Sequence, residues 1–394
     1  MLPGVNIPFG NGNALAPLKT TENIVGLICN TPTGVLTWGD NYVFHSWKSA
    51  AAVGVVRGTA VGEFLWAFFA ESTAYRETLQ LNTAPVIWVR PIKPIIGFDA
   101  LVAQADKLCD AAANKIATIF ICHEPGISYT PTIVDGADGA LWDALAAAQL
   151  WALDRLQTKK TPITFILKAN DIVSSAAIRD LNTESANRVG IIVGDDYNTA
   201  GIIAGRVAHA PVQRNIGRVK DGPIQLQSAK IGATPIDDYP ADELDELHTK
   251  QYIILRAFTD RTGYFIADDP LATDPTQDDY STLTRRRTAD KAWRIAFSTL
   301  TNELLDEVPT QAGGNIQQTY LKVLQGKVEN AIAAAMTANG ELSADQTDPN
   351  DRGVKCWFDP ASNIGTTNII VGTLQIRPMA YAKYINIPLS FNVQ

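Results

Sequence analysis

The first half of the chain alternates between short apolar runs and segments whose apolar residues recur at helical spacing. Continuous apolar runs of this length are typical of strands buried on both faces, and helical segments between them indicate crossover connections. The sequence therefore predicts a mostly parallel sheet flanked by helices. The predicted strands are Ile24–Ile28, Pro85–Val89, Ile116–Cys122, Ile163–Leu167 and Val189–Val193, and the predicted helices are Val61–Phe69, Leu101–Leu108 and Leu141–Leu156.

The pattern changes after Ala200. Gly201–His209 has the small-residue composition of a closely packed helix, and Pro211–Pro240 is rich in Gly, Pro and Asp. A long segment of that composition is typical of a connection between domains. We therefore predict a linker over residues 211–240.

A second region follows the predicted linker and mixes strands with long helices. Its helices carry apolar residues at three- and four-residue spacing, and its strands are short. The predicted elements are a strand at Tyr252–Phe258 with a hairpin return at Gly263–Ile266, helices at Thr284–Val308 and Ile316–Ala338, and strands at Lys355–Phe358, Ile369–Ile376 and Ala382–Val393.

Both ends of the chain show the same alternation of apolar and polar residues. Such a period of two marks a strand with one buried face. Pro8 and Pro388 each remove a backbone donor, so both strands are expected at a sheet edge. The apolar positions are Val5, Ile7 and Phe9 at the start and Ile385, Ile387, Leu389, Phe391 and Val393 at the finish.

A terminal strand needs a sheet that buries its apolar face. Ordering costs about 1–2 kcal/mol per residue, whereas each backbone hydrogen bond returns only about 0.5–1.5 kcal/mol net. Whether a terminal strand is stably ordered therefore depends on side-chain burial, which contributes about 1.5–3 kcal/mol per large aliphatic residue. Two interpretations stay open: each end pairs within its own subunit, or each is donated to a neighbouring copy. Gly10–Ala14 would suit a flexible tether, which donation to a neighbouring copy requires.

Composition narrows the classes of partner. The chain has 394 residues, 46% of them hydrophobic and 19% charged, which predicts two or three domains. Its net charge is −8 and its dense basic run is confined to Arg285–Arg287, so we expect no nucleic-acid partner. The four cysteines show no metal-ligand or redox spacing and are interpreted as buried, reduced thiols. Without a leader pattern or a long apolar segment, we expect cytoplasmic synthesis and no membrane insertion.

The sequence lacks the motifs of common enzymes. The sequence has no GxGxxG after the first predicted strand, no GxxxxGK[ST] and no GxSxG. His123–Glu124 is followed by Pro125, which breaks a metalloprotease helix, and Asp195–Asp196 after a predicted strand is explained equally well by helix capping. We predict no catalytic, cofactor or metal site. The acidic loop lacks the Gly and Glu of a calcium-binding EF-hand and is expected to form turns and to pair with Arg285–Arg287; it comprises Asp268, Asp269, Asp274, Asp278 and Asp279.

Three stretches together resemble contractile tail sheath proteins, the family found in phage tails and contractile injection systems. They are Pro211–Gly222, Arg261–Pro270, and Asp279–Tyr280 continuing to Arg287–Arg294. The family often carries a Gly-Tyr strand, an acidic loop and an Arg-x-x-Asp-Lys-Ala helix in this order. With the terminal strands, the resemblance spans most of the chain.

The resemblance implies a structural subunit rather than an enzyme. Family members polymerise as helical stacked rings around an inner tube protein, with a baseplate and a tail terminator as further partners. They contract without a nucleotide to drive the tube through a target envelope. The implied location is a virion tail or assembled contractile particle made in the bacterial cytoplasm. Two alternatives stay open: an α/β enzyme with an unrecognised nucleotide or small-molecule site, and a non-contractile tail or baseplate component.

The resemblance also implies a domain division and an assembly site. The expected fold class is mixed α/β and α+β: a mostly parallel α/β outer domain, with an α+β assembly domain built from the N-terminal arm and the C-terminal third. The divisions are 1–20 for the N-terminal arm and linker, 21–245 for the outer domain, 246–380 for the assembly domain and 381–394 for the C-terminal arm. The arms would add strands to neighbouring subunits. The receiving sheet would include Tyr252, Ile254, Ile369 and Val371.

Charged residues on the second long helix suggest where an inner tube would touch. Lys322, Lys327 and Glu329 could make contacts weak enough to break during contraction. An ordinary solvated helix face explains the same residues. Both interpretations stay open at this stage.

Overall fold

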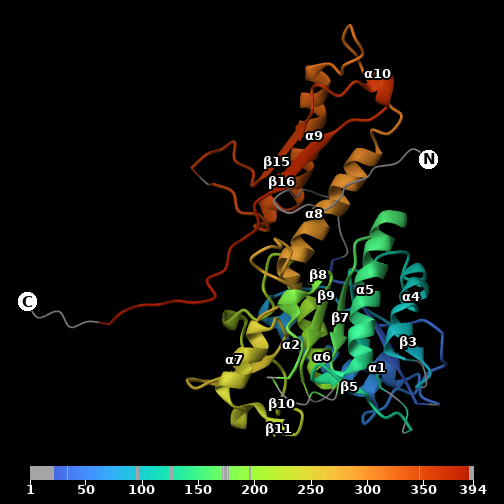
Figure 1. Cartoon of the computed structure of the whole chain (residues 1–394), viewed down its shortest axis with the longest axis vertical. Helices are drawn as coiled ribbons and strands as arrows, with labels where there is room; N and C mark the ends of the chain where they lie inside the picture. Colours follow the sequence, from blue (N-terminus) through green and yellow to red (C-terminus); the bar gives the residue numbers. More distant parts are fainter. Residues whose placement is uncertain are drawn as a thin grey trace, which may run out of the picture.

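The computed structural model describes residues 22–389, with the exception of residues 33, 95–96, 125, 127, 171, 173–174, 176, 195–196 and 346. The predicted arm residues Val5, Ile7, Phe9, Phe391 and Val393, and the pair Asp195–Asp196, lie outside the described residues. The molecule has a broad part built around the main sheet and a narrow part that contains the C-terminal helices and a hairpin (Figure 1).

The main sheet has six strands in the order β2-β3-β1-β4-β7-β9. Every residue of β1, β4, β7 and β9 is buried, which explains why these strands read as continuous apolar runs. The five predicted strands are confirmed as its parallel strands. The strands are β1 (Val25–Asn30), β2 (Tyr42–Phe44), β3 (Ile87–Ile92), β4 (Thr118–Cys122), β7 (Thr164–Lys168) and β9 (Val189–Ile192). The antiparallel edge strand β2 was not predicted because only one of its three residues is buried.

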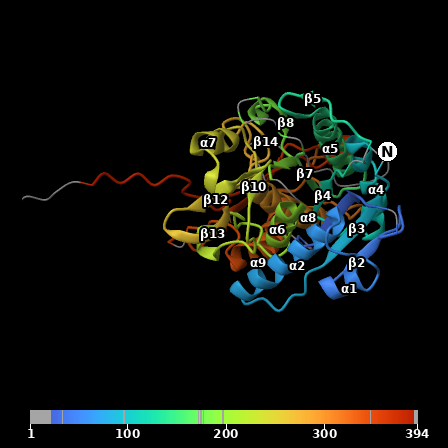
Figure 2. The same ribbon diagram turned by 90° about the horizontal axis from the view of Figure 1, so that it is seen from below.

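Helices cover both faces of this sheet. On one face α2 (Ala60–Thr78) packs against α6 (Tyr197–Val207), and on the other α3 (Phe98–Val102) packs against α5 (Gly139–Thr158), near α4 (Ala105–Ala111) (Figure 2). A Cβ atom at Gly201 would lie 2.3 Å from the carbonyl oxygen of Phe64, so glycine is what allows α6 to approach α2 this closely.

Short elements complete the broad part. They are α1 (Trp47–Ala51), β5 (Ile133–Val134), β6 (Ala137–Asp138), β8 (Ser185–Ala186), β10 (Lys230–Ile231), β11 (Thr234–Pro235), α7 (Ala241–Thr249), β14 (Ala272–Thr273) and single 3₁₀ turns at Leu181–Thr183, Val219–Asp221 and Ile236–Asp238. Within the described ranges, none of the helices combines the length and the apolar character needed to cross a lipid bilayer.

The predicted linker over residues 211–240 is wrong. This segment packs against the main core, because widely spaced apolar side chains anchor it between its Gly and Pro residues. Its backbone is also tied to α2, where Glu71 accepts a hydrogen bond from the Gln225 N–H at 2.6 Å. The buried apolar residues that join the main core are Ile216, Ile224, Ala229, Ile231 and Ile236, whereas Val212 lies in the cluster of the narrow part.

The segment after α7 also belongs to the broad part. Ile253 donates from its N–H to the Ile191 carbonyl (2.9 Å) and accepts from the Val193 N–H (3.0 Å), which extends the main sheet beyond β9. The hairpin of β12 (Leu255–Phe258) and β13 (Arg261–Ile266) follows. Its buried residues Leu255 and Ile266 join the same hydrophobic cluster, which continues to Leu283. Residues 246–283 therefore pack with the predicted outer domain, whereas the sequence had placed them in the assembly domain.

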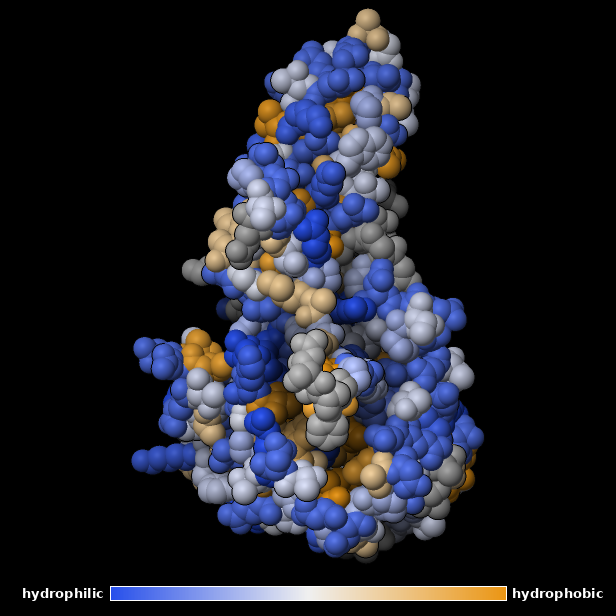
Figure 3. Space-filling view, turned by 90° about the vertical axis from the view of Figure 1, so that its left-hand side faces the viewer, coloured by the Kyte–Doolittle hydropathy of each residue, from blue (hydrophilic) through white to orange (hydrophobic). Residues whose placement is uncertain are grey.

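The narrow part has its own hydrophobic cluster. Its elements are α8 (Leu283–Thr301), α9 (Gln318–Ala335), a 3₁₀ turn (Thr337–Asn339), β15 (Val354–Phe358), α10 (Ile364–Thr367) and β16 (Gly372–Ile376). Helix α8 spans both parts, since Leu283 lies in the first cluster and Ala292 and Ile295 lie in the second. The narrow part rises from the broad one with a mostly hydrophilic surface interrupted by scattered apolar residues (Figure 3).

Candidate assembly interface

The hairpin of β15 and β16 forms a two-stranded sheet with one packed face and one open face. Cys356 and Phe358 are 7% and 9% exposed and pack into the second hydrophobic cluster with Leu374 and Ile376. Trp357, on the opposite face, is 48% exposed. A two-stranded sheet is marginal unless it packs on other elements, and α9 supplies that support.

The hydrogen-bond register shows which backbone groups point away from the hairpin. Arg377 donates to the Gly353 carbonyl and Asp359 donates to the Val371 carbonyl, each at 2.8 Å. Antiparallel ladders alternate between bonded and non-bonded pairs, so the pair Cys356–Leu374 between them directs its N–H and C=O groups outward. Both long edges of the hairpin therefore offer backbone groups to a further strand.

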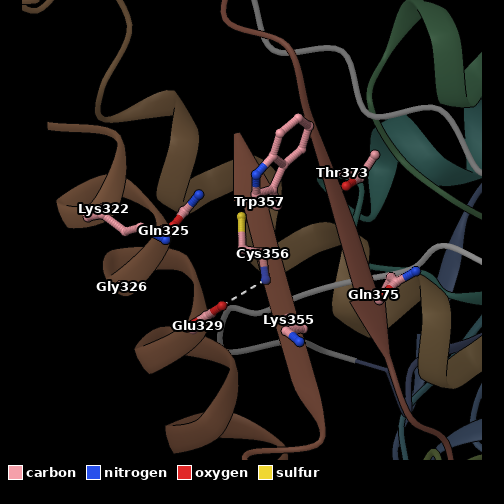
Figure 4. Close-up of a pocket in the computed structure, with 9 residues that line it drawn as sticks. All are labelled: Lys322, Gln325, Gly326, Glu329, Lys355, Cys356, Trp357, Thr373 and Gln375. Carbon is pink, nitrogen blue, oxygen red and sulfur yellow. Dashed lines mark hydrogen bonds between the residues drawn. The ribbon is translucent and has the colours of Figure 1, made fainter. Parts of the chain in front are cut away.

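The β15 edge is engaged by a side chain of α9. The Glu329 Oε1 atom accepts a hydrogen bond from the Cys356 N–H at 2.8 Å (Figure 4). Burial, together with the nearby Glu329 carboxylate, raises the pKa of the Cys356 thiol to about 12. The thiol is therefore a neutral packing group, and the Glu329 carboxylate accepts a hydrogen bond from the backbone of β15.

A cavity of about 340 Å³ lies between α9 and the hairpin. It brings together two of the three residues predicted to contact a tube, Lys322 and Glu329. The third, Lys327, instead pairs with Glu303 at 2.7 Å. The lining residues, all drawn in Figure 4, are Lys322, Gln325, Gly326, Glu329, Lys355, Cys356, Trp357, Thr373 and Gln375.

The C-terminal segment leaves its own molecule. Its ribbon runs away from the body after the hairpin, and the described residues 384–389 make no hydrogen bond to the rest of the described chain (Figure 1). Ile385, Ile387 and Leu389 are 76%, 81% and 96% exposed. The predicted strand Ala382–Val393 therefore has no partner strand over its described residues. Its apolar face is displayed to solvent.

The root of this segment is held against the broad part. Lys383 forms an ion pair with Asp268, which lies 3.6 Å from the His248 Nε2 atom. Although burial opposes it, the contacts with His248 and Lys383 lower the pKa of Asp268. Pro378 also forms a bridge with Leu342. The free part of the segment therefore begins at Tyr384.

The acidic loop forms turns, as predicted: Asp274 accepts from the Thr276 N–H and Asp278 from the Tyr280 N–H, each at 2.8 Å. It also contacts the start of α8. Asp269 caps the start of α8 by accepting from the Thr284 N–H at 3.0 Å, and Asn215 donates to both Asp268 and Asp269.

The neighbouring basic run is buried and has several partners. Arg286 pairs with Asp290 inside α8 and also lies over the ring of Tyr280, at the end of the loop, 4.3 Å from its centroid. Arg287 donates to backbone carbonyls of residues 207 and 210.

The structure does not bring the four predicted receiving residues into one sheet. Tyr252 and Ile254 are 0% and 2% exposed and lie in the first cluster, whereas Ile369 and Val371 are 58% and 55% exposed beside the hairpin. Ile369 and Val371 precede β16, which begins at Gly372. The sequence could not separate the two sets, because strands of both clusters share the same local pattern.

The carboxyl ends of the parallel strands, where an enzyme of this class would bind its substrate, hold a network of internal contacts. The His123 carbonyl accepts from Asn170 Nδ2 (2.6 Å) and from the Tyr197 hydroxyl (3.0 Å), and the His123 ring stacks on Phe98 with centroids 5.2 Å apart. The Lys168 ammonium donates to Asn170 at 2.8 Å. These residues connect strand ends to neighbouring loops.

Comparisons with known proteins agree with this architecture. Two family models match, described as DUF2586, N-terminal domain (residues 2–270) and DUF2586, C-terminal domain (residues 279–394). A comparison with curated proteins gave no match. Among solved structures, a sheath complex of the extracellular contractile injection system PVC in the contracted state is similar with 11% identity and a TM-score of 0.62, covering 100% of this chain and 98% of that one.

A second solved structure is the sheath tail protein Lin1278 from Listeria innocua. It is 8% identical with a TM-score of 0.51, covering 90% of this chain and 91% of that one. At such identities the likeness concerns the fold. The mixed α/β architecture that the sequence predicts, and its resemblance to sheath proteins at the level of the fold, are confirmed.

Proposed function

The chain belongs to the DUF2586 family, and from that membership together with its fold we propose that it is a subunit of a contractile tail sheath. Copies would polymerise as helical stacked rings around an inner tube. Contraction would rearrange rigid subunits while terminal arms keep them connected, and would drive the tube through a target envelope. Baseplate and terminator proteins would complete the particle.

The exposed C-terminal segment carries this proposal. Ile385, Ile387 and Leu389 are the apolar positions of the predicted strand, and their side chains are exposed to solvent. An unpaired strand with such a face is a liability in a monomer, and it is stabilised when another chain supplies both a hydrogen-bond ladder and a packing surface. Since the β16 edge of the hairpin has no partner strand among the described residues and lies beside a hydrophobic cluster, strand exchange between copies would satisfy both the arm and the hairpin.

The division into units follows the two hydrophobic clusters. We place the outer domain from residue 21 to about Leu283 and the assembly domain in the remaining residues before the arm at 381–394, with residues 1–20 as the N-terminal arm. Val5, Ile7 and Phe9 would be the apolar positions of that first arm.

The α9 side of the hairpin is the surface proposed to face the tube. Lys322 is exposed and forms no ion pair among the described residues, whereas Lys327 and Glu329 are engaged by Glu303 and Cys356. Lys322 is therefore the side chain of this set most open to an acidic group on the tube. Contacts of this kind between exposed charges are weak and sensitive to salt, which suits a surface that slides.

Electron microscopy of the purified protein tests the proposal. Negative staining is expected to show rings or tubes, and truncation after Lys383, which removes the exposed strand while keeping its root, is expected to abolish long tubes. A truncation lacking residues 1–10 tests the first arm in the same way. A discrete monomer whose thermal stability rises with a small molecule would instead favour the enzyme interpretation.

A further inference from the structure

Gly326 leaves an open space on α9. A glycine inside a helix is unfavourable relative to alanine, and a close neighbour usually explains it. In the broad part that neighbour is present, since a Cβ atom at Gly201 or Gly205 would lie 2.3 or 2.8 Å from a carbonyl oxygen of α2. A Cβ atom at Gly326 would have no atom of another element within 4 Å among the described residues. The space above Gly326 is therefore not filled by this chain.

That space belongs to the cavity between α9 and the hairpin, which combines apolar walls with a basic rim. Trp357 and Cys356 line it from β15, and Trp357 is 48% exposed (Figure 4). Lys355 lies on the same strand, is exposed and forms no ion pair among the described residues. The volume of about 340 Å³ is at the small end of the range for ligand pockets. The cavity therefore suits one apolar side chain with a carboxylate beside it.

The loop after α8 presents such a group. Leu305 is 85% exposed, and its φ of 63° lies in the left-handed region that is unfavourable for a residue with a Cβ atom. Asp306 and Glu307 follow it, both exposed and without an ion pair among the described residues. An apolar side chain is thus held outward, at a cost in backbone conformation, next to two carboxylates. This loop matches the cavity in polarity and in charge.

The loop and the cavity lie on different sides of α9. Glu303, at the start of the loop, pairs with Lys327, whereas Gly326 and Glu329 line the cavity. Leu305 is not among the residues that line the cavity of its own molecule. Two different surfaces that match each other form a head-to-tail contact, which repeats from copy to copy into rings or helices.

We infer that Leu305 of one copy inserts into the cavity between α9 and β15 of the next copy, with Asp306 and Glu307 beside Lys355 of that copy. This inference rests on the proposed sheath function and adds a contact between assembly domains that uses neither terminal arm. Because Lys355 on β15 takes the acidic groups, Lys322 on α9 stays available to the tube.

Two substitutions test the contact from its two sides. Gly326→Leu fills the cavity, and Leu305→Ala removes the inserted group. Each should raise the protein concentration needed for tube assembly about tenfold or more, the factor expected for one buried leucine side chain. Thermal unfolding checks that each variant folds.

The matched controls change the same residue types without affecting the contact. Gly326→Ala leaves most of the cavity open, and Leu150→Ala shortens a leucine of α5 that is 69% exposed. Both should assemble as the unmodified chain does. Assembly of Gly326→Leu and Leu305→Ala at the unmodified concentration overturns the inference.

An exchange of charges tests the polar part of the contact without changing the cavity. Lys355→Glu alone, and Asp306→Lys together with Glu307→Lys, should each weaken assembly because like charges then meet. All three changes in one chain should restore it, since opposite charges face each other again. A combined variant that assembles no better than the separate ones contradicts the assigned pairing.

Crosslinking separates failure of this inference from failure of the proposed function. Chains with Asp306→Cys are mixed with chains with Lys355→Cys, so that a short thiol-reactive linker joins these positions only between copies. Links should exceed those of two controls: Asp306→Cys mixed with the unmodified chain, which measures background from the four native cysteines, and Leu150→Cys mixed with Lys355→Cys.

Microscopy of the same samples records whether tubes form. Tubes without links above background overturn the inference and leave the sheath function standing. Links without tubes keep the contact and overturn the sheath function, and the absence of both overturns both.

Discussion

The broad and narrow parts of this molecule differ in how completely each satisfies its own backbone. In the broad part β1 is buried along its whole length and is hydrogen-bonded to β3 on one side and β4 on the other. In the narrow part β16 has one partner, β15, and an outer edge without one among the described residues. In the broad part, the hydrogen bonds of this central strand are made within the chain itself. The narrow part leaves an edge that another copy would pair in the proposed sheath, so substitutions should affect folding in the first part and assembly in the second.

The largest expected effect is in the buried ion pairs where α8 enters the broad part. Asp290 is 3% exposed and accepts from Arg188 at 3.1 Å, and it also pairs with Arg286. Asp290→Ala would leave two guanidinium groups without this carboxylate and should lower the free energy of unfolding by about 3–5 kcal/mol. Denaturant unfolding measures the loss. In the narrow part, the half-exposed pair of Lys327 is the matched control, and Lys327→Ala should have a much smaller effect on unfolding, because exposed ion pairs contribute little. Similar losses of stability in Asp290→Ala and Lys327→Ala would contradict the proposed difference between the two parts.

Acid should weaken the broad part through His209. This side chain is 2% exposed, neither ring nitrogen has a hydrogen-bond partner among the described residues, and burial together with Arg76 lowers its pKa to about 4. The unfolded chain binds a proton near pH 6.5, whereas the folded chain resists it, so stability should fall by about 3 kcal/mol as the pH drops from 6.5 to 4.

Unfolding of His209→Leu over the same pH range measures this contribution. The variant should lose that part of the pH dependence, and replacement of the exposed His45 by Gln should retain it. A pH dependence unchanged in His209→Leu would show that other groups govern acid sensitivity.

The same glycine-to-alanine change should have opposite effects in the two parts. At Gly201 the new Cβ would lie 2.3 Å from the Phe64 carbonyl oxygen, and overpacking of this kind costs about 1–3 kcal/mol. At Gly326 in α9 nothing lies within 4 Å, so alanine should stabilise the helix by about 0.5–1 kcal/mol through its higher propensity. Thermal unfolding of both variants compares them directly, and destabilisation at Gly326 would reveal a closer neighbour there.

The smallest effect on folding should come with a clear effect on assembly. Lys383 is 43% exposed at its side chain and pairs with Asp268 at the root of the arm. Lys383→Ala should change unfolding only slightly, because the lysine is partly exposed and the buried Asp268 keeps its hydrogen bond from Asn215 and its contact with His248. It should reduce the yield of long tubes by releasing the arm from its fixed exit. Lys383→Arg should keep the yield of long tubes. A full yield with Lys383→Ala would show that assembly does not require the ion pair at the root of the arm.

The sequence predicts the broad part well because its strands are buried on both faces. A continuous apolar run such as Ile116–Cys122 is explained by few structures other than a central strand. Residues 211–240 were misread because Gly and Pro indicate turns whether or not the turns are packed. The anchoring residues, such as Ile216 and Ile224, are too widely spaced to show a period.

The assembly site was predictable only in part. The alternation at Ile385, Ile387 and Leu389 identifies a strand with one apolar face, and the structure adds that this face is exposed. That Glu329 bonds the backbone of β15 has no counterpart in local sequence, since it depends on how α9 lies beside a strand that begins at Val354. Likewise, nothing near Asp268 points to Lys383, which lies 115 residues away.

Helix α8 makes the subunit behave mechanically as one piece. Its first turn is locked into the large cluster by Leu283 and its later turns into the small one by Ile295, without a break between them. Bending the helix would separate the buried ion pair of Asp290 and Arg188, whose charges solvent cannot compensate. In the proposed sheath, each subunit would therefore turn as a rigid body, and the arm beyond Lys383 would accommodate a change in ring diameter.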